Sequence, residues 1–431
     1  FKIIIMKMWN KIDLLSKKIE KFTVGNDRTY DLFIAKYDVQ ASIAHAKMLN
    51  KINILNNKEL KLIVKELSKI QKSISTGNFI LEDKFEDIHS KIEFKLVESL
   101  GEIGKKIHTG RSRNDQVLVA TQLYLKNEII EIKKLIKNLF DLLISLSNKN
   151  KNNLIPGYTH MQVAMPSSFG LWFSSYAECL IDDILYFNTA YKINNQNPLG
   201  SAAGYGSSFE IDREFTTKEL GFETLKYNVV AAQMSRGKVE KSVAVAIGSV
   251  ANTLSQLSND ICLYMAQEFN FIFFPEKITT GSSIMPHKKN PDVFELIRSK
   301  CNSVQSINNE LNLISNNLAS GYHRDKQLFK EKIISGIETT KDCLEVMIYS
   351  LKEIKVRKLI LKDDKYKFIY SVENLNELVK KGVNFRDAYV EISESIKNKK
   401  FTPYKKINHS LKGGINNLCL REIKSKMKNN F

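Results

Sequence analysis

The stretch from Arg111 to Ile155, RSRNDQVLVATQLYLKNEIIEIKKLIKNLFDLLISLSNKNKNNLI, contains neither glycine nor proline. Its apolar residues recur at spacings of three and four, which is the period of a helix with one buried face. We therefore predict one helix of roughly 30 residues, about 45 Å long. The apolar positions are Val117, Leu118, Leu123, Leu125, Ile129, Ile132, Leu135, Ile136, Leu139, Leu142, Leu143 and Leu146.

Three later segments repeat this pattern with few interruptions. They run from Lys238 to Phe271, from Pro291 to Leu318 and from Lys326 to Val356. Strand-like alternation is nearly absent, so the sequence predicts an all-α fold in which the long helices pack as a bundle. The run from Val243 to Ile247 is apolar over a wide arc, which needs neighbours on several sides and predicts association with other subunits.

The helical patterns are shorter on both sides of these segments. We therefore expect three domains: an N-terminal helical domain over residues 1–107, a central helical bundle over 108–356 and a small C-terminal helical domain over 357–431. The apolar opening Phe1–Met6 is shorter than the apolar core of a signal peptide. No apolar run reaches the roughly 18–20 residues that a membrane span requires, so no membrane association is expected.

Composition narrows the class of protein further. The five cysteines are far apart and odd in number, which predicts neither a disulfide framework nor a zinc site and favours the cytoplasm. The net charge of +18 comes mostly from lysines scattered among asparagines and isoleucines, without a nucleic-acid-binding motif. We attribute the charge to compositional bias, with attraction of anionic substrates as the alternative, and expect no nucleic-acid partner.

Polar, non-periodic segments lie near the ends of the predicted helices. Segments from distant parts of the sequence, or from several chains, can therefore converge on one site. They are Glu86–His89, His108–Asp115, Gly157–Gln162, Asn197–Gly204, Gly281–Asp292 and Gly321–Asp325.

The segment Gly281–Asp292 is the most unusual of these. It combines hydroxyls, prolines, lysines, a histidine, an amide and a carboxylate, a mixture that no apolar core requires. Its prolines exclude regular helix, and the apolar pattern resumes after Pro291. The segment is therefore predicted to be an ordered loop before a helix, whose free N–H groups can bind an anion.

These segments hold the groups that an anionic substrate and a proton transfer require. The cations Arg111, Arg113, Lys288, Lys289 and Arg324 suit carboxylates or phosphates. A histidine and a carboxylate on a nearby helix, His160 and Glu295, suit proton transfer near neutral pH. No phosphate-binding loop, dinucleotide fingerprint or histidine pair at metal-ligand spacing is present, which favours cofactor-free acid–base chemistry. Each residue alone has a structural explanation, such as a cap or an ion pair, so only their joint occurrence predicts a site.

The motifs resemble those of a known family. Gly281–Pro291, GSSIMPHKKNP, resembles the signature of the fumarase/aspartase superfamily. Several further segments resemble one member family, the argininosuccinate lyases. These are His108–Gln116 (HTGRSRNDQ), Gly157–Gln162 (GYTHMQ), Asn197–Ser201 (NPLGS), Tyr322–Gln327 (YHRDKQ) and Glu377–Arg386 (ELVKKGVNFR).

The resemblance implies a fold and a reaction. The fold is all-α with three domains, and four chains associate through the central helices into a core of twenty. Each active site takes motifs from three chains. The reaction splits argininosuccinate reversibly into L-arginine and fumarate, the last step of arginine biosynthesis, without a cofactor or metal. A base removes a proton beside a carboxylate, and a general acid assists the leaving guanidinium.

The resemblance also implies roles for residues. Ser282 is the base, activated by Lys288 and nearby N–H groups, and His160 is the general acid, oriented by Glu295. Whether Ser282 or His160 takes the proton stays open. The succinate carboxylates are expected near Ser112, Arg113, Asn114, Thr159, Lys288 and Asn290. The arginine end is expected near Tyr322, Gln327 and Lys330, while Arg236, Asp87 and His89 match further family positions.

Three other hypotheses compete with this interpretation. Adenylosuccinate lyase belongs to the same superfamily, but the Ser112-Arg113-Asn114 motif favours argininosuccinate. Some relatives are inert structural proteins of the eye lens; the presence of Ser282 and His160 favours an enzyme instead. A nucleic-acid binder is suggested by charge alone, and its binding would weaken steeply with salt.

Overall fold

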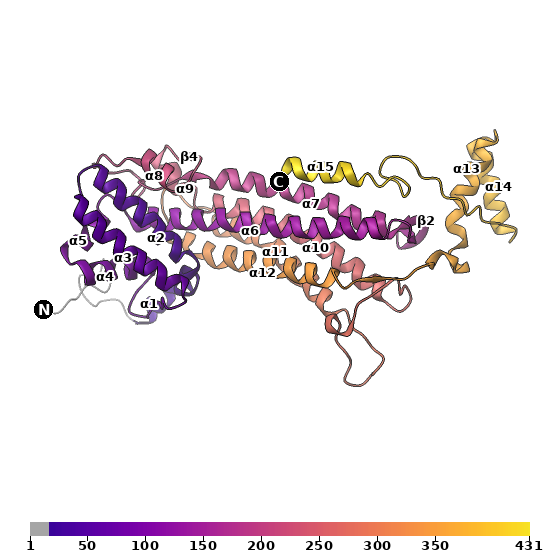
Figure 1. Cartoon of the computed structure of the whole chain (residues 1–431), viewed down its shortest axis with the longest axis horizontal. Coiled ribbons are helices and arrows are strands. Elements are labelled where there is room, and N and C mark those ends of the chain that lie inside the picture. Colours follow the sequence, from indigo (N-terminus) through magenta and orange to yellow (C-terminus); the bar gives the residue numbers. More distant parts are fainter. Residues whose placement is uncertain (1–16) are drawn as a thin grey trace. The chain divides into compact units, whose positions relative to one another are not determined.

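The computed structural model describes residues 17–431, and these are predominantly helical (Figure 1). The prediction of an all-α fold is confirmed. The opening segment Phe1–Met6 and the start of the predicted N-terminal domain lie outside the described residues. Within the part that is described, no helix is both long and apolar enough to cross a membrane.

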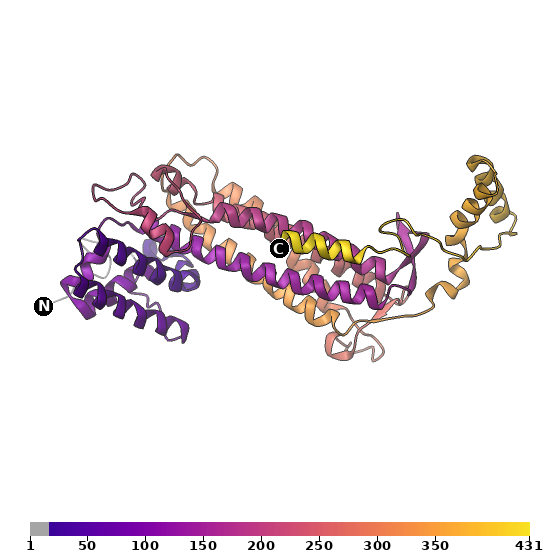
Figure 2. The same cartoon turned by 45° about the horizontal axis from the view of Figure 1, so that its top comes forward.

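Long helices dominate the fold, and adjacent helices lie side by side (Figures 1 and 2). Four of them fall within the four segments predicted from the sequence, and α7 lies outside those segments. The long helices are α6 (Arg113–Lys149), α7 (Phe169–Asn194), α10 (Lys238–Met265), α11 (Asp292–Ile314) and α12 (Phe329–Leu351).

The chain forms two compact units, each built from three stretches of sequence. Among the described residues, the first unit comprises 17–132, 186–249 and 303–340, and the second comprises 133–185, 250–302 and 341–431. These boundaries cross each long helix named above, so each contributes one part to each unit. The division into three consecutive domains stays a prediction.

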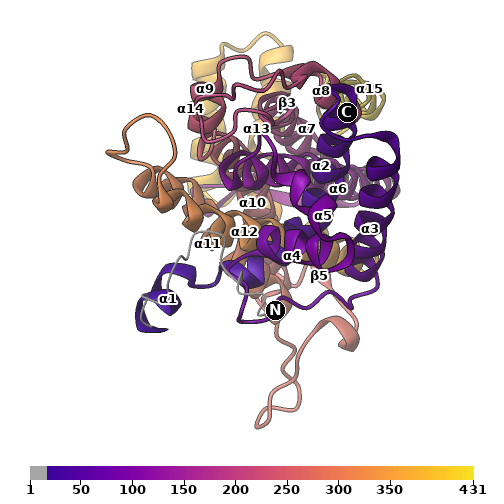
Figure 3. The same ribbon diagram turned by 90° about the vertical axis from the view of Figure 1, so that its left-hand side faces the viewer.

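Helix α2, which has 25 residues, and several shorter helices complete the first unit. Helix α3 begins with a capping box, in which the Asn56 side chain accepts hydrogen bonds from Lys58 N and Glu59 N while Glu59 bonds back to Asn56 N. Helices α2 and α3 lie side by side (Figure 3). The elements are α1 (Lys17–Val24), α2 (Asp27–Lys51), α3 (Asn57–Ser75), α4 (Ile88–Leu100), α5 (Glu102–Lys105), η1 (Lys106–His108), the parallel strands β3 (Gln196–Asn197) and β4 (Thr224–Leu225), α8 (Arg213–Glu219), α9 (Val229–Met234) and η3 (Arg324–Leu328).

Close helix packing in the first unit depends on a glycine. A Cβ atom at Gly336 of α12 would lie 2.4 Å from Ile307 Cδ1 of α11 and 3.1 Å from Ile247 Cδ1 of α10. The three helices can approach this closely because position 336 has no side chain.

In the second unit, α7 and α10 pack through aromatic side chains. Trp172 and Phe173 are buried. Asp260 of α10 accepts hydrogen bonds from Trp172 Nε1 at 2.9 Å and from Tyr176 Oη at 2.6 Å. The other elements are an antiparallel hairpin of β1 (Leu154–Thr159) and β2 (Gln162–Ser168), the antiparallel pair β5 (Ile272–Phe273) and β6 (Lys355–Val356), η2 (Glu276–Ile278), η4 (Ile360–Lys362), η5 (Asp364–Tyr370), α13 (Ser371–Lys380), α14 (Phe385–Lys397) and α15 (Leu420–Asn430).

Candidate active site

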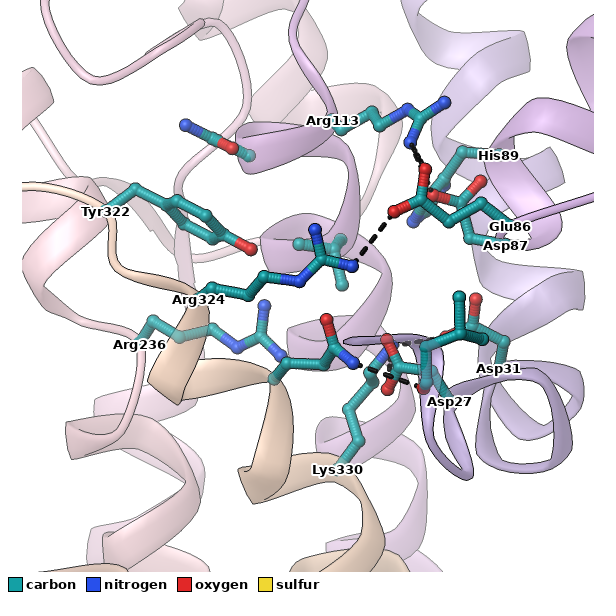
Figure 4. A pocket seen from close by; sticks show the side chains of 14 residues that line it. Asp27, Asp31, Glu86, Asp87, His89, Arg113, Arg236, Tyr322, Arg324 and Lys330 are labelled. Atoms are coloured by element: carbon teal, nitrogen blue, oxygen red, sulfur yellow. Dashed lines mark hydrogen bonds and ion pairs between the residues drawn. The ribbon is translucent and has the colours of Figure 1, made fainter. Parts of the chain in front are cut away.

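A cavity of about 220 Å³ in the first unit is lined largely by charged side chains, and we call it the charged pocket (Figure 4). It gathers residues from α1, α2, α4, α6, η3 and α12 and from connecting loops. Acids and bases are similar in number, so the pocket suits a ligand that carries both signs of charge. The lining residues are Val24, Asp27, Asp31, Glu86, Asp87, His89, Arg113, Asn114, Val117, Arg236, Tyr322, Arg324, Gln327 and Lys330.

Lys330 forms a buried ion-pair cluster at one side of this pocket. Its ammonium contacts the Asp27 carboxylate at 3.0 Å and also bonds to Asp31, whose side chain is fully buried. Burial raises the pKa of Asp27 to about 6, although Lys330 acts in the opposite direction. Burial lowers the pKa of Lys330, but Asp31 and Asp27 outweigh it and raise the pKa overall, so the amine stays charged.

Arg113 and Arg324 approach Glu86 from two sides (Figure 4). Arg113 Nη1 donates to Glu86 Oε2 at 2.9 Å and lies 3.1 Å from Asp87 Oδ2, while its Nη2 donates to Ser90 Oγ at 2.9 Å. Arg324 Nη2 donates to Glu86 Oε1 at 3.0 Å. Glu86 therefore holds both guanidinium groups at the pocket.

Two buried side chains of the pocket, His89 and Arg236, each have one nitrogen without a hydrogen-bond partner among the described residues. His89 Nδ1 bonds Asp38 Oδ1 at 2.9 Å, and its buried Nε2 has no partner within residues 17–431. Burial lowers the pKa of His89, but Asp38 and then Asp87 and Asp31 outweigh burial and raise it, which favours the imidazolium. Arg236 pairs through Nε with Glu240 at 3.2 Å, and in the same described part its buried Nη2 is unpartnered. Buried donors of this kind are expected to meet a ligand or water.

Asp115 joins two of the predicted polar segments. Its fully buried carboxylate accepts from Ser112 N at 2.9 Å and from Gly200 N and Ala202 N, each at 3.0 Å. Ser112 Oγ in turn accepts from Asn114 N at 3.3 Å, as an N-cap does at the start of α6. Asp115 thus fixes the Ser112–Asn114 segment against the turn at 200–202.

In the second unit, His160 lies at the tip of the β1–β2 hairpin. Thr159 pairs with Gln162, which leaves His160 and Met161 as the two-residue turn, with φ of 53° and 59°. Such turns usually contain asparagine or glycine, because other residues are strained in the left-handed region. The side chains of Thr159 and His160 are exposed. A histidine and a methionine held in this conformation at an exposed tip indicate a functional constraint.

The loop before α11 places Ser282 against backbone donors. Ser282 Oγ accepts hydrogen bonds from Met285 N at 3.0 Å and from Ile284 N at 3.3 Å. The ends of the loop are tied by backbone bonds between Thr280 and Asn290, of 2.8 and 3.3 Å. Two N–H groups directed at one hydroxyl oxygen would stabilise negative charge on it.

The remaining predicted residues of the second unit are near this loop in sequence. The side chains of Lys288 and Glu295 are exposed, and Asn290 Nδ2 donates to Gly281 O at 3.4 Å. Glu295 belongs to the first turn of α11. Within the described residues of this single chain, no hydrogen bond joins Glu295 to His160.

The structure therefore gathers eight predicted site residues around one cavity. These are Asp87, His89, Arg113, Asn114, Arg236, Tyr322, Gln327 and Lys330. Ser112 belongs to the same unit, whereas Thr159, His160, Ser282, Lys288, Asn290 and Glu295 belong to the other. Asp27 and Asp31 line the pocket but were not predicted, whereas Glu86 belongs to a predicted polar segment and Arg324 was named only as a cation suited to carboxylates or phosphates. The four-residue spacing of Asp27 and Asp31, one helical turn apart, was the available signal for the first two.

Comparison with known proteins gives the same family as the motifs. A family model described as lyase matches residues 16–306. The argininosuccinate lyase of Bacteroides thetaiotaomicron is 51% identical over 421 residues, which cover 98% of this chain and 94% of the relative. The argininosuccinate lyase of Thermotoga neapolitana is 40% identical over 388 residues, which cover 90% of this chain and 98% of the relative.

Solved structures of low sequence identity share the fold. A variant of EDDS lyase with bound fumarate aligns with a TM-score of 0.75 at 18% identity, covering 95% of this chain and 88% of that one. The class II fumarase of Schistosoma mansoni aligns with a TM-score of 0.74 at 17% identity, covering 96% and 95%. With half of its residues identical to curated relatives over nearly the full length of both, the chain belongs to the argininosuccinate lyase family of the fumarase/aspartase superfamily.

Proposed function

We propose that the two units have different roles in the reaction of this family, the reversible elimination that converts argininosuccinate to L-arginine and fumarate. The charged pocket of the first unit binds the arginine end, and the hairpin tip and loop of the second unit supply the proton-transfer groups. This assignment rests on one observation: acidic side chains line the same cavity as buried donors of Arg236 and His89 that have no partner among residues 17–431. An arginine moiety carries both an ammonium and a carboxylate, which these groups complement.

In the proposed mechanism, Ser282 removes the proton beside a carboxylate of the succinate moiety. A serine hydroxyl is a poor base near neutral pH, so its alkoxide must be stabilised. The N–H groups of Met285 and Ile284 already point at Ser282 Oγ, which supports this role. Lys288 and Arg113 neutralise the carboxylate charge that grows as the carbanion forms. The uncharged side chains of Ser112, Asn114, Thr159 and Asn290 donate hydrogen bonds to the carboxylates.

His160 is the proposed general acid. It protonates the guanidinium nitrogen as the carbon–nitrogen bond breaks, and Glu295 orients its ring. The left-handed backbone at the hairpin tip supports this role, because strain without a function would be lost easily.

We further propose that the enzyme is a homotetramer with three domains in each chain and active sites shared between chains. Large apolar side chains are exposed on the long helices, including Val245 on α10, Leu296 and Leu313 on α11 and Val346 on α12. Exposed apolar side chains on these helices support burial against other subunits. A cytoplasmic location is proposed because the five cysteines are far apart in the sequence and odd in number, unlike those of a disulfide framework.

The test is the release of fumarate, followed by its ultraviolet absorbance. The wild-type protein should release fumarate from argininosuccinate, and Ser282→Ala should abolish the release. Ser283→Ala, which removes the adjacent hydroxyl, is the matched control and should keep activity. His160→Asn should lower turnover by roughly 10²–10⁴-fold. Cleavage of adenylosuccinate alone, or of neither substrate, would contradict the proposal.

Mixing tests the sharing of sites between chains. Ser282→Ala and His160→Asn proteins are each expected to be inactive or nearly so, but mixed tetramers would contain some sites with both residues intact. Partial recovery of activity is expected after subunit exchange. No recovery, once exchange is verified by mass, would rule out shared sites.

A further inference from the structure

Arg324 differs from the other strongly basic residues of the charged pocket. Its side chain is 48% exposed, whereas Arg113, Arg236 and Lys330 are 22%, 3% and 4% exposed. In Figure 4 its guanidinium lies among the charged groups of the pocket, with Tyr322 and Glu86 on either side. Arg324 is therefore the cation of this pocket that a ligand can reach with the least rearrangement.

The hydrogen bonds of Arg324 leave much of its guanidinium unused. Nη2 donates to Glu86 Oε1 at 3.0 Å and to Thr23 O at 3.1 Å. Within the described residues, Nε and Nη1 have no partner. Arg113, in contrast, uses both terminal nitrogens on Glu86, Asp87 and Ser90. In this structure the terminal nitrogens of Arg113 are largely occupied by protein groups, so Arg324 retains more unused donors for a ligand.

Glu86 is arranged so that Arg324 can leave it. Arg113 bonds Oε2 of Glu86 and Arg324 bonds Oε1, so the carboxylate keeps its Arg113 bond when Arg324 turns away. A ligand carboxylate in place of Glu86 Oε1 would accept hydrogen bonds from both Nη1 and Nη2 of Arg324. The two parallel N–H groups of a guanidinium match the two oxygens of a carboxylate. The exchange therefore leaves neither Glu86 nor Arg324 without an ionic partner.

We propose that Arg324 is a further substrate-binding residue, which exchanges the Glu86 carboxylate for the α-carboxylate of the arginine moiety. This rests on the proposed function, in which Tyr322, Gln327 and Lys330 surround the arginine end. Arg324 lies between Tyr322 and Gln327 in sequence and lines the same cavity. Asp27 and Asp31 line the same cavity and place two carboxylates against the single ammonium of Lys330, which suits the positive groups of that moiety.

Agmatine provides the discriminating probe, because it is arginine without the carboxylate. Binding of L-arginine and of agmatine to the full-length enzyme is measured by calorimetry, independently of turnover. Arg324→Gln should weaken the binding of L-arginine on the order of tenfold or more, and it should change the affinity for agmatine by no more than about twofold. Arg324→Lys, which keeps the charge but loses the fork, should give an intermediate loss.

Two further variants test the exchange itself. Glu86→Gln competes less for Arg324, so it should bind L-arginine at least as tightly as the wild type. Lys69→Gln removes an exposed cation that pairs with Glu66 on α3 at 2.7 Å, and it should change the affinity for neither ligand. Thermal unfolding of each variant verifies that it is folded.

The outcomes separate this inference from the proposed function. If the wild type cleaves argininosuccinate but Arg324→Gln weakens both ligands equally, or neither, Arg324 does not bind the carboxylate and the inference fails alone. Weaker binding of L-arginine by folded Glu86→Gln would overturn the exchange. A wild type that neither cleaves argininosuccinate nor binds L-arginine would overturn both proposals.

Discussion

Replacing Lys330 by methionine removes the cation that neutralises two carboxylates at the charged pocket. Lys330 is 4% exposed, Asp31 is fully buried and Asp27 is 16% exposed, so water can solvate the separated charges only poorly. Removing one partner of a buried ion pair costs about 3–5 kcal/mol. Asp31 also accepts a hydrogen bond from Ile88 N at 3.2 Å, which remains in the variant. We therefore expect Lys330→Met to lower the free energy of unfolding by about 3 kcal/mol, near the lower end of that range.

Urea unfolding measures this change, and the same helix offers a control. Lys332 of α12 pairs with Glu310 at 2.9 Å, but both side chains are more than one-third exposed. Lys332→Met should therefore change the free energy of unfolding by less than about 1 kcal/mol. In a double-mutant cycle, Asp31→Asn should recover part of the loss in Lys330→Met, with a coupling energy of about 2 kcal/mol or more. Equal effects of the two lysine variants, or additive effects in the cycle, would refute the reasoning.

Two other predictions concern pH and packing. The pKa of Asp27 is raised by burial from 3.8 to about 6, so the unfolded chain loses this proton first as pH rises. The stability of the wild type relative to Asp27→Asn should therefore decrease from pH 4 to pH 6 and then level off; a constant difference in denaturant titrations would contradict this. Gly336→Val should lower the free energy of unfolding by about 1–3 kcal/mol, because its side chain would overlap Ile307 and Ile247. The control Gly248→Ala should not destabilise, since its Cβ would lie 3.9 Å from Gln305 Cα; an equal loss in both variants would exclude overpacking as the cause.

The long helices could be predicted because their signals are local. Helix α10 begins at Lys238, directly after Gly237 with its φ of 92°, and α11 begins directly after Pro291. The β1–β2 hairpin was missed because its turn residues, His160 and Met161, carry no turn signal in the sequence. Tertiary structure holds them in a conformation that their own propensities disfavour.

The candidate site could be predicted where motifs are contiguous and not where packing makes the contact. The segments at 108–116 and 322–327 supplied Arg113, Asn114, Tyr322 and Gln327 of the pocket. Asp31, by contrast, reaches Lys330 across 299 positions of sequence, and periodicity alone gives no partner for a carboxylate within a helix. Such pairings depend on how α2 and α12 pack, which no local pattern specifies.

The buried charges around the pocket are themselves an argument for a ligand. Stability alone does not require Lys330 with Asp31, or Arg236 with Glu240, because apolar replacements of similar volume are often neutral or stabilising. Each pair instead holds a cation in a fixed position at the wall of one cavity. A fixed charge in a poorly hydrated site attracts an opposite charge more strongly than a mobile charge in water, and little reorganisation remains for the binding step. Nη2 of Arg236 and Nε2 of His89, which have no partner among residues 17–431, are then available donors for a ligand. They are desolvated already during folding, so binding does not add that cost.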